Sequence, residues 1–388
     1  MTELNDGTIA QRLMEARRAI GLTQGQVGKQ VGMATSTISA IEAGKRSVSG
    51  RELHAFARIY HRPISYFFEQ SPAGSPGFQY LFRAAEPEVL NRVSIIKLEE
   101  MARDYVLLEE LVGAAPLPTP PDYSTFGFRT DHDAETMAEM ERGRLGMGDA
   151  PVRDLMNLLD GSVGIRTFLV PISQSTWSGV VVRGHDGRLC VAVNSKEESY
   201  RRNFDLAHEY GHALVHMNGQ RDTAARIDSR TGGMASSRAE ERFADAFASA
   251  FLMPTRAVLK ALEQALRANG GRFTDFDLVH MAMQFGVSGQ ALSNRLVSLR
   301  KISRQRNEDY WKSQGSYKQL AKELGYFTED WTREPVLPRR FRYLAIKAYE
   351  EELISLARLA ELLREDYHEL RSRLTQEAEE PGSARAAG

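Results

Sequence analysis

The sequence is poor in the features that mark secreted or membrane-spanning proteins. It has a single cysteine, Cys190, which excludes a disulfide framework or a cysteine-rich zinc cluster within the chain. No stretch approaches the roughly 18 apolar residues of a membrane-spanning helix, and the first residues lack a basic and then apolar leader. We therefore expect a cytoplasmic protein with no membrane partner.

The chain also has almost no net charge. Its 50 Lys and Arg residues nearly balance its 51 Asp and Glu residues, which gives a formal net charge of −1. The overall charge therefore gives no sign of nucleic-acid binding, and any basic surface must be local. The 388 residues, of which 42% are hydrophobic and 26% charged, predict a globular protein of two or three domains.

The clearest chemical pattern lies in residues 204–216, which read FDLAHEYGHALVH. Here His208, Glu209 and His212 match H-E-x-x-H. Two histidines four residues apart on a helix face the same side, so both rings can reach one zinc ion, and Glu209 can accept a proton from the attacking water. A surface helix with two ordinary histidines gives the same pattern, so the motif alone does not distinguish a zinc site from such a helix.

A second acidic and then apolar helix is predicted downstream, where residues 238–254 read RAEERFADAFASAFLMP. A hydrolytic zinc site needs a third protein ligand. We predict Glu241, because Asp245 lies one turn later on the same face and could accept the free N–H of a zinc-bound histidine. Glu240 lacks such a partner and is expected to be a solvated acid. His216, one turn beyond the motif, is an alternative third ligand.

These two motifs, in this order, resemble those of the ImmA/IrrE family of metallopeptidases. The likeness spans residues 151–254, and its second motif consists of Glu241, Ala244, Asp245, Phe247, Ala248, Leu252, Met253 and Pro254. The resemblance implies one Zn²⁺ per chain, held by His208, His212 and Glu241, with Glu209 as the catalytic base. It favours Glu241 over His216 as the third ligand, and we expect His216 to be packed or to face the substrate.

The N-terminal part has the helix and turn spacing of a helix-turn-helix unit. Between residues 8 and 62 nine Lys or Arg residues stand against three Asp or Glu residues, so basic charge is concentrated here. Residues 22–46, LTQGQVGKQVGMATSTISAIEAGKR, resemble the XRE/Cro–C1 repressor type of helix-turn-helix domain. The resemblance implies a double-stranded DNA operator as partner, and repressors of this type suggest a homodimer.

In that family the third helix enters the major groove. The resemblance implies base contacts from its hydroxyl side chains, which are Thr35, Ser36, Thr37 and Ser39. Gln24 would meet the DNA backbone and support this helix, and Lys45 and Arg46 would contact phosphate. Alternatively, the hydroxyl groups only cap and solvate a short helix.

We expect a mostly helical α+β protein with a small antiparallel sheet, with strands at residues 164–171, 179–183 and 188–194. The predicted divisions are a five-helix helix-turn-helix domain (1–70), a linker and connecting helix (71–130), a zincin-like peptidase domain (131–300), a helical C-terminal region (301–376) and a disordered tail (377–388).

The sequence thus predicts a DNA-binding transcriptional regulator with a zinc endopeptidase domain. The resemblance implies that its substrate is a partner repressor, cleaved in a stress or mobile-element response in a bacterial cytoplasm, at the nucleoid when DNA is bound. Two other functions fit the same residues. One is a non-proteolytic regulator whose zinc domain senses a ligand or metal, and the other is an antitoxin-like regulator in a toxin–antitoxin or phage module.

Overall fold

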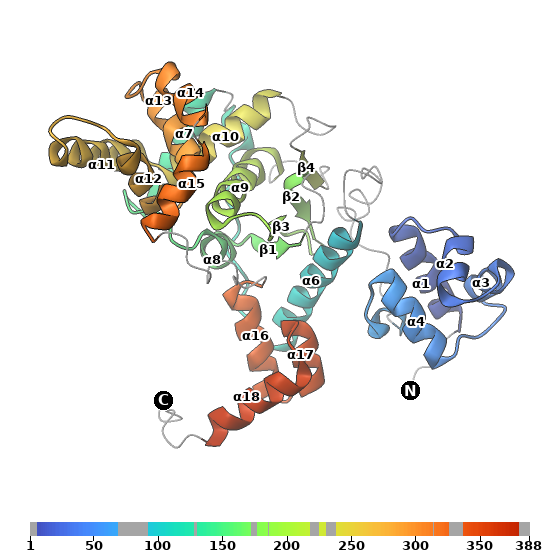
Figure 1. The fold of residues 1–388 in the computed structure, drawn as a ribbon. Coiled ribbons are helices and arrows are strands. Elements are labelled where there is room, and N and C mark those ends of the chain that lie inside the picture. Colours follow the sequence, from blue (N-terminus) through green and yellow to red (C-terminus); the bar gives the residue numbers. More distant parts are fainter. Residues whose placement is uncertain are drawn as a thin grey trace.

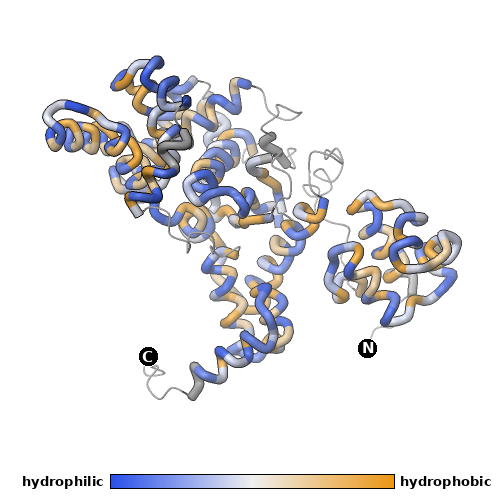
Figure 2. The backbone as a smooth tube through the Cα atoms, viewed as in Figure 1, coloured by the Kyte–Doolittle hydropathy of each residue, from blue (hydrophilic) through white to orange (hydrophobic). Residues whose placement is uncertain are grey.

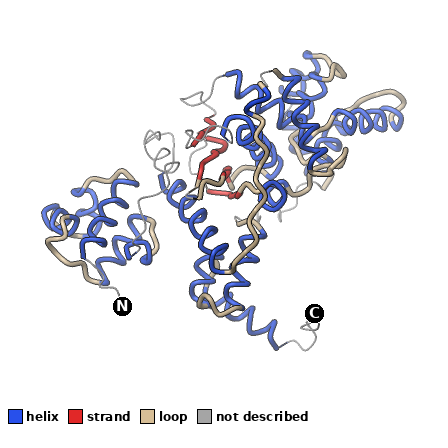
Figure 3. The backbone as a smooth tube through the Cα atoms, turned by 180° about the vertical axis from the view of Figure 1, so that it is seen from behind, coloured by secondary structure: helices blue, strands red, loops and turns tan. Residues whose placement is uncertain are grey.

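The computed structural model describes residues 6–68, 92–127, 130–171, 177–184, 186–217, 225–229, 238–312, 314–325 and 337–379. Helices dominate these residues, and one small sheet lies among them (Figures 1 and 3). The predicted α+β class is therefore confirmed. No helix in the described ranges is long and apolar enough to cross a membrane.

The N-terminal bundle consists of four α-helices and one 3₁₀-helix. They are α1 Asp6–Ala19, α2 Gln24–Val31, α3 Thr35–Glu42, α4 Gly50–Tyr60 and η1 Ile64–Phe68. Capping boxes at Thr23 and Ser49 start α2 and α4, and Gly32 ends α2 with a φ of 72°. The apolar faces of all five helices meet in one core, to which Leu13, Val27, Ile38, Phe56 and Phe67 contribute.

The sheet has four described strands in the order β1-β3-β2-β4. They are β1 Arg166–Val170, β2 Trp177–Arg183, β3 Leu189–Asn194 and β4 Ala225–Ser229. β2 is antiparallel to β3 and to β4, whereas β1 is parallel to β3. The sheet is therefore mixed and not wholly antiparallel as predicted, because β3 inserts between β1 and β2. β4 was not predicted, because its sequence ARIDS contains no run of large apolar residues.

Helices cover both faces of this sheet. The front face, with Val181, Val191 and Val193, belongs to the same core as α9 Ser199–His212. The side chains that alternate with these form the rear face, which consists of Phe168, Val170, Val180, Val182, Cys190 and Ala192. The rear face packs against helices from both ends of the chain: α6 Arg92–Leu111, α16 Arg339–Glu350, α17 Leu356–Leu363 and α18 Tyr367–Glu379. Figure 2 shows hydrophobic and hydrophilic residues alternating along these helices.

The remaining helices contribute to the same core as α9 or lie directly beside it. They are η2 Ser124–Phe126, α7 Asp131–Arg144, α8 Leu155–Leu158, η3 Leu159–Val163, η4 Ala213–Met217, α10 Arg238–Leu252, α11 Thr255–Ala268, α12 Asp275–Gln284, α13 Gly289–Ser298, α14 Arg304–Lys312 and α15 Gln314–Glu323. α10 packs more extensively against α9 than any other described helix does, and it also packs along α7. α10 and α9 are therefore the two helices that hold the predicted metal site.

The domain boundaries remain predictions. The proposed linker segment falls in residues 69–91, which lie outside the described ranges. The expected connecting helix exists as α6 and lies on the rear face of the sheet. α18 continues to Glu379, which is inside the predicted disordered tail, and residues 380–388 lie outside the described ranges.

A buried ion pair joins the N-terminal bundle to α6. Arg62 Nη2 donates a hydrogen bond of 2.6 Å to Glu99 Oε2, and Arg62 Nη1 lies 3.5 Å from Glu100 Oε1. The same guanidinium lies over the ring of Tyr66, 4.6 Å from its centroid. Because both Arg62 and Glu99 are almost inaccessible to water, this contact fixes the bundle against the helix that covers the sheet.

Candidate metal centre

The H-E-x-x-H residues lie in the last turns of α9, where the helix is buried on nearly all sides. Tyr210 packs edge-to-face on Phe247 and Phe251 of α10, and this contact holds the two helices together. Gly211 allows them to approach closely, since a Cβ atom there would lie 2.9 Å from Cδ1 of Phe247. α9 then continues into η4 without a break, which keeps His216 on the same helical rod.

Three predicted ligands come together between α9 and α10. The Nε2 atoms of His208 and His212 lie 3.0 Å apart. Glu241 places one carboxylate oxygen 3.3 Å from His208 Nε2 and the other 3.4 Å from His212 Nε2. Within the described ranges, these three form the one group of His, Cys, Asp or Glu side chains close enough to share a metal ion.

The donor set fits zinc. Two imidazole nitrogens and a carboxylate are common zinc ligands, and ligands about 2.0–2.1 Å from a tetrahedral ion lie about 3.3 Å from one another. The observed separations of 3.0 to 3.4 Å match that value. Three protein ligands also leave the open position that a hydrolytic site requires.

The opposite ring nitrogens have partners of their own. His208 Nδ1 lies 2.9 Å from Asp245 Oδ1, as the spacing on α10 predicted. His212 Nδ1 lies 2.9 Å from His216 Nδ1. His216 is thus placed behind His212 and outside the three-residue cluster, and its Nε2 lies 4.0 Å from Glu240 Oε1. Such partners fix the tautomer and orientation of ligand rings.

The electrostatics of the cluster favour a cation. Burial lowers the pKa of His208, but the hydrogen bonds to Asp245 and Glu241 outweigh it and raise this pKa well above its ordinary value. The same negative charge would stabilise a divalent metal ion held by the neutral ring.

Glu209 is buried beneath β2, with only 1% of its surface exposed. A Cβ atom on Gly179 would lie 2.3 Å from Glu209 Oε1, so β2 and this carboxylate could not approach so closely with any larger residue. Gly179 therefore belongs to the candidate site, although no role for it was predicted from the sequence. A glycine inside an apolar strand was the available signal, since it marks a close approach of the backbone.

The predicted DNA-contacting residues lie in the N-terminal bundle. On α3, Thr35, Ser36 and Ser39 are exposed, whereas Thr37 is half-buried. Ser36 and Ser39 face away from the buried side chains of Ile38 and Ile41, whereas Thr37 precedes Ile41 by one turn and shares its side of the helix.

The three remaining predicted contacts differ in their surroundings. Gln24 Nε2 donates a hydrogen bond of 2.9 Å to Glu42 Oε2, which ties the start of α2 to the end of α3. Lys45 is exposed, and Arg46 Nη2 donates to Glu52 Oε1 at 2.8 Å. Of the two predicted phosphate contacts, Lys45 is therefore exposed to solvent, whereas Arg46 is already paired with Glu52.

Comparison with known proteins gives the same two parts. A family described as "Helix-turn-helix domain" matches residues 8–64, and a family described as "IrrE N-terminal-like domain" matches residues 161–297. The chain combines a helix-turn-helix domain with an IrrE/ImmA-like domain. Both predicted resemblances are therefore confirmed, and the predicted metal cluster and Glu209 lie within the IrrE/ImmA-like match.

The helix-turn-helix regulator also has a curated relative. It is similar to a protein of Rhodospirillum rubrum described as "Uncharacterized transcriptional regulator in ATPase CF(0) region", with 30% identity over 71 residues. The match covers 18% of this chain and 66% of the relative's own length.

Proposed function

We propose that this regulator is a zinc-dependent endopeptidase that cleaves a partner repressor protein in the bacterial cytoplasm. The observation that carries the proposal is the convergence of His208, His212 and Glu241 on one point, with Glu209 next to them on the same helix. A sensor domain needs ligands alone, whereas a buried carboxylate beside the ligands is what proton transfer requires.

The residues then have separate roles. Zinc, when held by His208, His212 and Glu241, would supply a Lewis acid that activates water and polarises the scissile carbonyl. Glu209 accepts the proton of the attacking water and passes it to the leaving nitrogen. Asp245 keeps His208 oriented through its Nδ1 atom, and His216 does the same for His212.

The sheet offers a place for the substrate backbone. β4 lies at one edge of the described sheet and is paired on one side only, with β2. A substrate segment can add to such an edge as a further strand. β2 also carries Gly179, whose backbone touches Glu209, so this edge runs close to the proposed base.

The DNA-binding bundle would bring the peptidase to its substrate. A partner repressor bound at the same operator is held near the metal centre, which raises its effective concentration without any new contact. The buried pair of Arg62 and Glu99 supports this arrangement, because it holds the bundle on α6 instead of leaving it on a loose tether. We also propose that the regulator binds its operator as a homodimer.

The test compares new protein N-termini in cells that carry the wild type or Glu209→Gln, before and after DNA damage or oxidative stress. We expect a terminus that appears only with the wild type, and its sequence would identify the substrate. If purified proteins both hold zinc and no stress yields such a terminus, the proposal of proteolysis is wrong and a zinc-dependent sensor takes its place.

A further inference from the structure

A groove leads away from the metal centre between α7, α9, α10 and α13. Its cavity has a volume of about 950 Å³. Asp245, which hydrogen-bonds to His208, lines this groove, and 61% of its side chain is exposed there. The groove therefore begins beside the metal cluster, on the side of His208 that faces Asp245.

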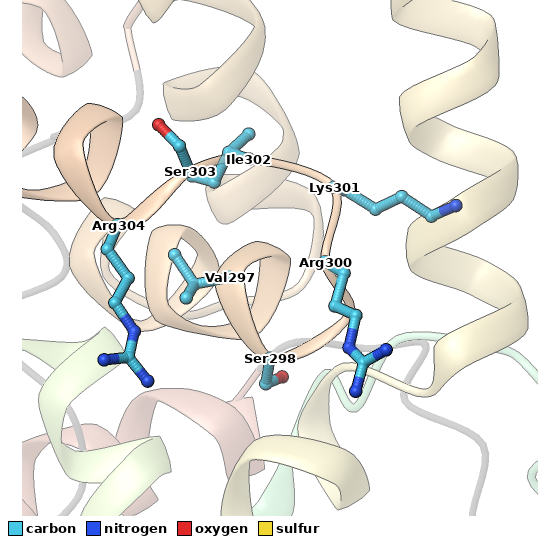
Figure 4. A pocket seen from close by; sticks show the side chains of 7 residues that line it. All are labelled: Val297, Ser298, Arg300, Lys301, Ile302, Ser303 and Arg304. Carbon is cyan, nitrogen blue, oxygen red and sulfur yellow. The ribbon is translucent and has the colours of Figure 1, made fainter.

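The groove is continuous with a second hollow at the end of α13. This basic pocket, formed by residues 297–304, has a volume of about 620 Å³ (Figure 4). Ser298 and Arg300 line both cavities, so the two hollows adjoin at these residues. In Figure 4 the guanidinium groups of Arg300 and Arg304 extend in the same direction on either side of Ser298, while Lys301 points away from both.

Charge is balanced along the groove but not in the basic pocket. Apart from Arg300, which the two cavities share, the arginines that line the groove are paired with acids. The distances are 3.0 Å for Arg242 to Asp131, 2.7 Å for Arg295 to Glu135 and 3.4 Å for Arg201 to Asp205. In the basic pocket, Arg300, Lys301 and Arg304 are exposed and make no ion pair within the described part of the chain. Positive charge therefore gathers at the end remote from the metal.

The backbone conformation of Arg300 is consistent with a binding role for its side chain. Its φ is 57°, a left-handed conformation that glycine adopts most easily. Arg300 N donates to Val297 O at 2.9 Å and Lys301 N donates to Leu296 O at 2.8 Å, which is the helix ending that usually carries glycine. An arginine here destabilises the fold slightly and places a guanidinium over the pocket.

We propose that the basic pocket binds an acidic segment of the polypeptide substrate, several residues from the bond that is cut. The proposal rests on the peptidase function and adds a substrate class to it. DNA phosphate is the other source of negative charge, but α13 and α14 lie on the far side of the IrrE/ImmA-like domain from the DNA-binding bundle (Figures 1 and 3). An acidic polypeptide reaches the pocket through the groove, whereas an operator held by α3 does not.

Peptide binding by the full-length, zinc-loaded Glu209→Gln protein tests the proposal. The probes are fluorescent pools of degenerate peptides about twelve residues long, which can extend to about 40 Å. One pool has glutamates at its N-terminal end, one has them at its C-terminal end, and a third has glutamines instead. We expect one acidic pool to bind about three- to tenfold more tightly than the glutamine pool, in line with a few exposed ion pairs.

Three further substitutions separate binding from folding. Arg300→Gly should weaken binding of the acidic pool and raise the thermal midpoint, because it removes the cation and relieves the left-handed backbone. Glu352→Gly is the matched control, since Glu352 has a φ of 59° at the end of α16 and lies outside the groove. It should raise the midpoint and leave peptide binding unchanged. Arg304→Ala should weaken only the binding of the acidic pool.

Equal binding of all three pools, or binding that Arg300→Gly and Arg304→Ala leave unchanged, would overturn the proposal. So would displacement of the acidic pool by a duplex DNA that still binds after Lys45→Ala. The peptidase function is judged separately, by wild-type hydrolysis of the pools. If the pools are hydrolysed with no preference for acidic peptides, the proposal of an acidic-segment pocket is wrong and the peptidase function stands. If the acidic pool binds but is not hydrolysed, the pocket is supported and the peptidase function is not.

Discussion

The Nδ1 atoms of His212 and His216 lie 2.9 Å apart, so a histidine of the metal cluster is oriented by a second histidine. His208 meets a carboxylate at the equivalent atom, 2.9 Å away. The two rings of the cluster are thus held by different chemistry, one by an ionic partner on α10 and the other by a neighbour one turn along its own helix.

Loss of His216 should weaken metal binding without removing a ligand. We expect His216→Ala to lower zinc affinity about tenfold, the usual effect of losing a group that orients a ligand. Competition against a chromophoric chelator measures this. His280→Ala is the control, because His280 is exposed on α12. An unchanged zinc affinity in His216→Ala would show that the ring of His212 is fixed by packing alone.

Gly179→Ala should abolish hydrolysis while zinc is retained. The new methyl group would lie 2.3 Å from Glu209 Oε1, so the carboxylate has to move away from its place beside the cluster. We expect hydrolysis to fall about 100-fold or more, as for loss of a general base. Gly143→Ala is the matched control, since nothing lies within 4 Å of its Cβ position and it should stabilise α7. Full activity in Gly179→Ala would mean that the position of Glu209 is unimportant.

The contribution of Glu100, which lies where α6 meets the N-terminal bundle, to folding stability should fall as pH rises. Burial raises the pKa of Glu100 from its ordinary value of 4.5 to about 7, and the attraction of Arg62 only partly opposes this. Between pH 4.5 and 7 the folded protein therefore holds more protons than the unfolded chain, so the contribution of Glu100 to the free energy of unfolding falls as pH rises.

Chemical denaturation of Glu100→Gln across this pH range tests whether Glu100 lowers the free energy of unfolding as pH rises. The variant should match the wild type near pH 4.5 and be increasingly more stable up to pH 7 and above, because glutamine never ionises. Glu350→Gln, an exposed position on α16, is the control and should follow the wild type at every pH. A variant that is less stable than the wild type above pH 7 would contradict the prediction.

Lys45 and Arg46 should contribute unequally to DNA binding. Each phosphate contact lowers the slope of log affinity against log salt by about 0.9, so Lys45→Ala should flatten that slope by about one. Arg46→Ala should flatten it less, because Arg46 first has to leave Glu52, 2.8 Å away. Anisotropy titrations of a random-sequence duplex over a salt series measure both, with Arg371→Ala on α18 as the control. Equal slopes for all variants would remove this loop from the DNA interface.

The sequence predicted best what depends on local spacing. His208, Glu209 and His212 are fixed relative to one another by one helix, and Asp245 follows Glu241 by one turn of another. The structure brings together the three predicted ligands and Asp245, as expected. Their roles, and that of Glu209 as the base, remain predictions. His216 shows where spacing alone fails, since a residue one turn from His212 can turn towards the cluster or behind it. Packing against Phe243 of α10, with ring centroids 6.3 Å apart, accompanies the second outcome.

Long-range pairing could not be read from the sequence. The parallel pairing of β1 and β3 and the addition of β4 join segments whose own patterns do not specify a partner. The same is true of α6, whose apolar residues favour a connecting helix but also fit a dimer seam or packing across domains. Only the structure shows that it lies on the rear face of the sheet beside α16 and α17.

That rear face also sets an order of events during synthesis. The core of the N-terminal bundle draws on residues 13–67, so the DNA-binding part can close as soon as they leave the ribosome. The rear face has to wait for Leu337 and the helices after it, which at about 5–20 residues per second means on the order of ten seconds after β3 emerges. For that interval, the nascent chain carries a finished helix-turn-helix bundle beside an apolar sheet face that only α6 can cover.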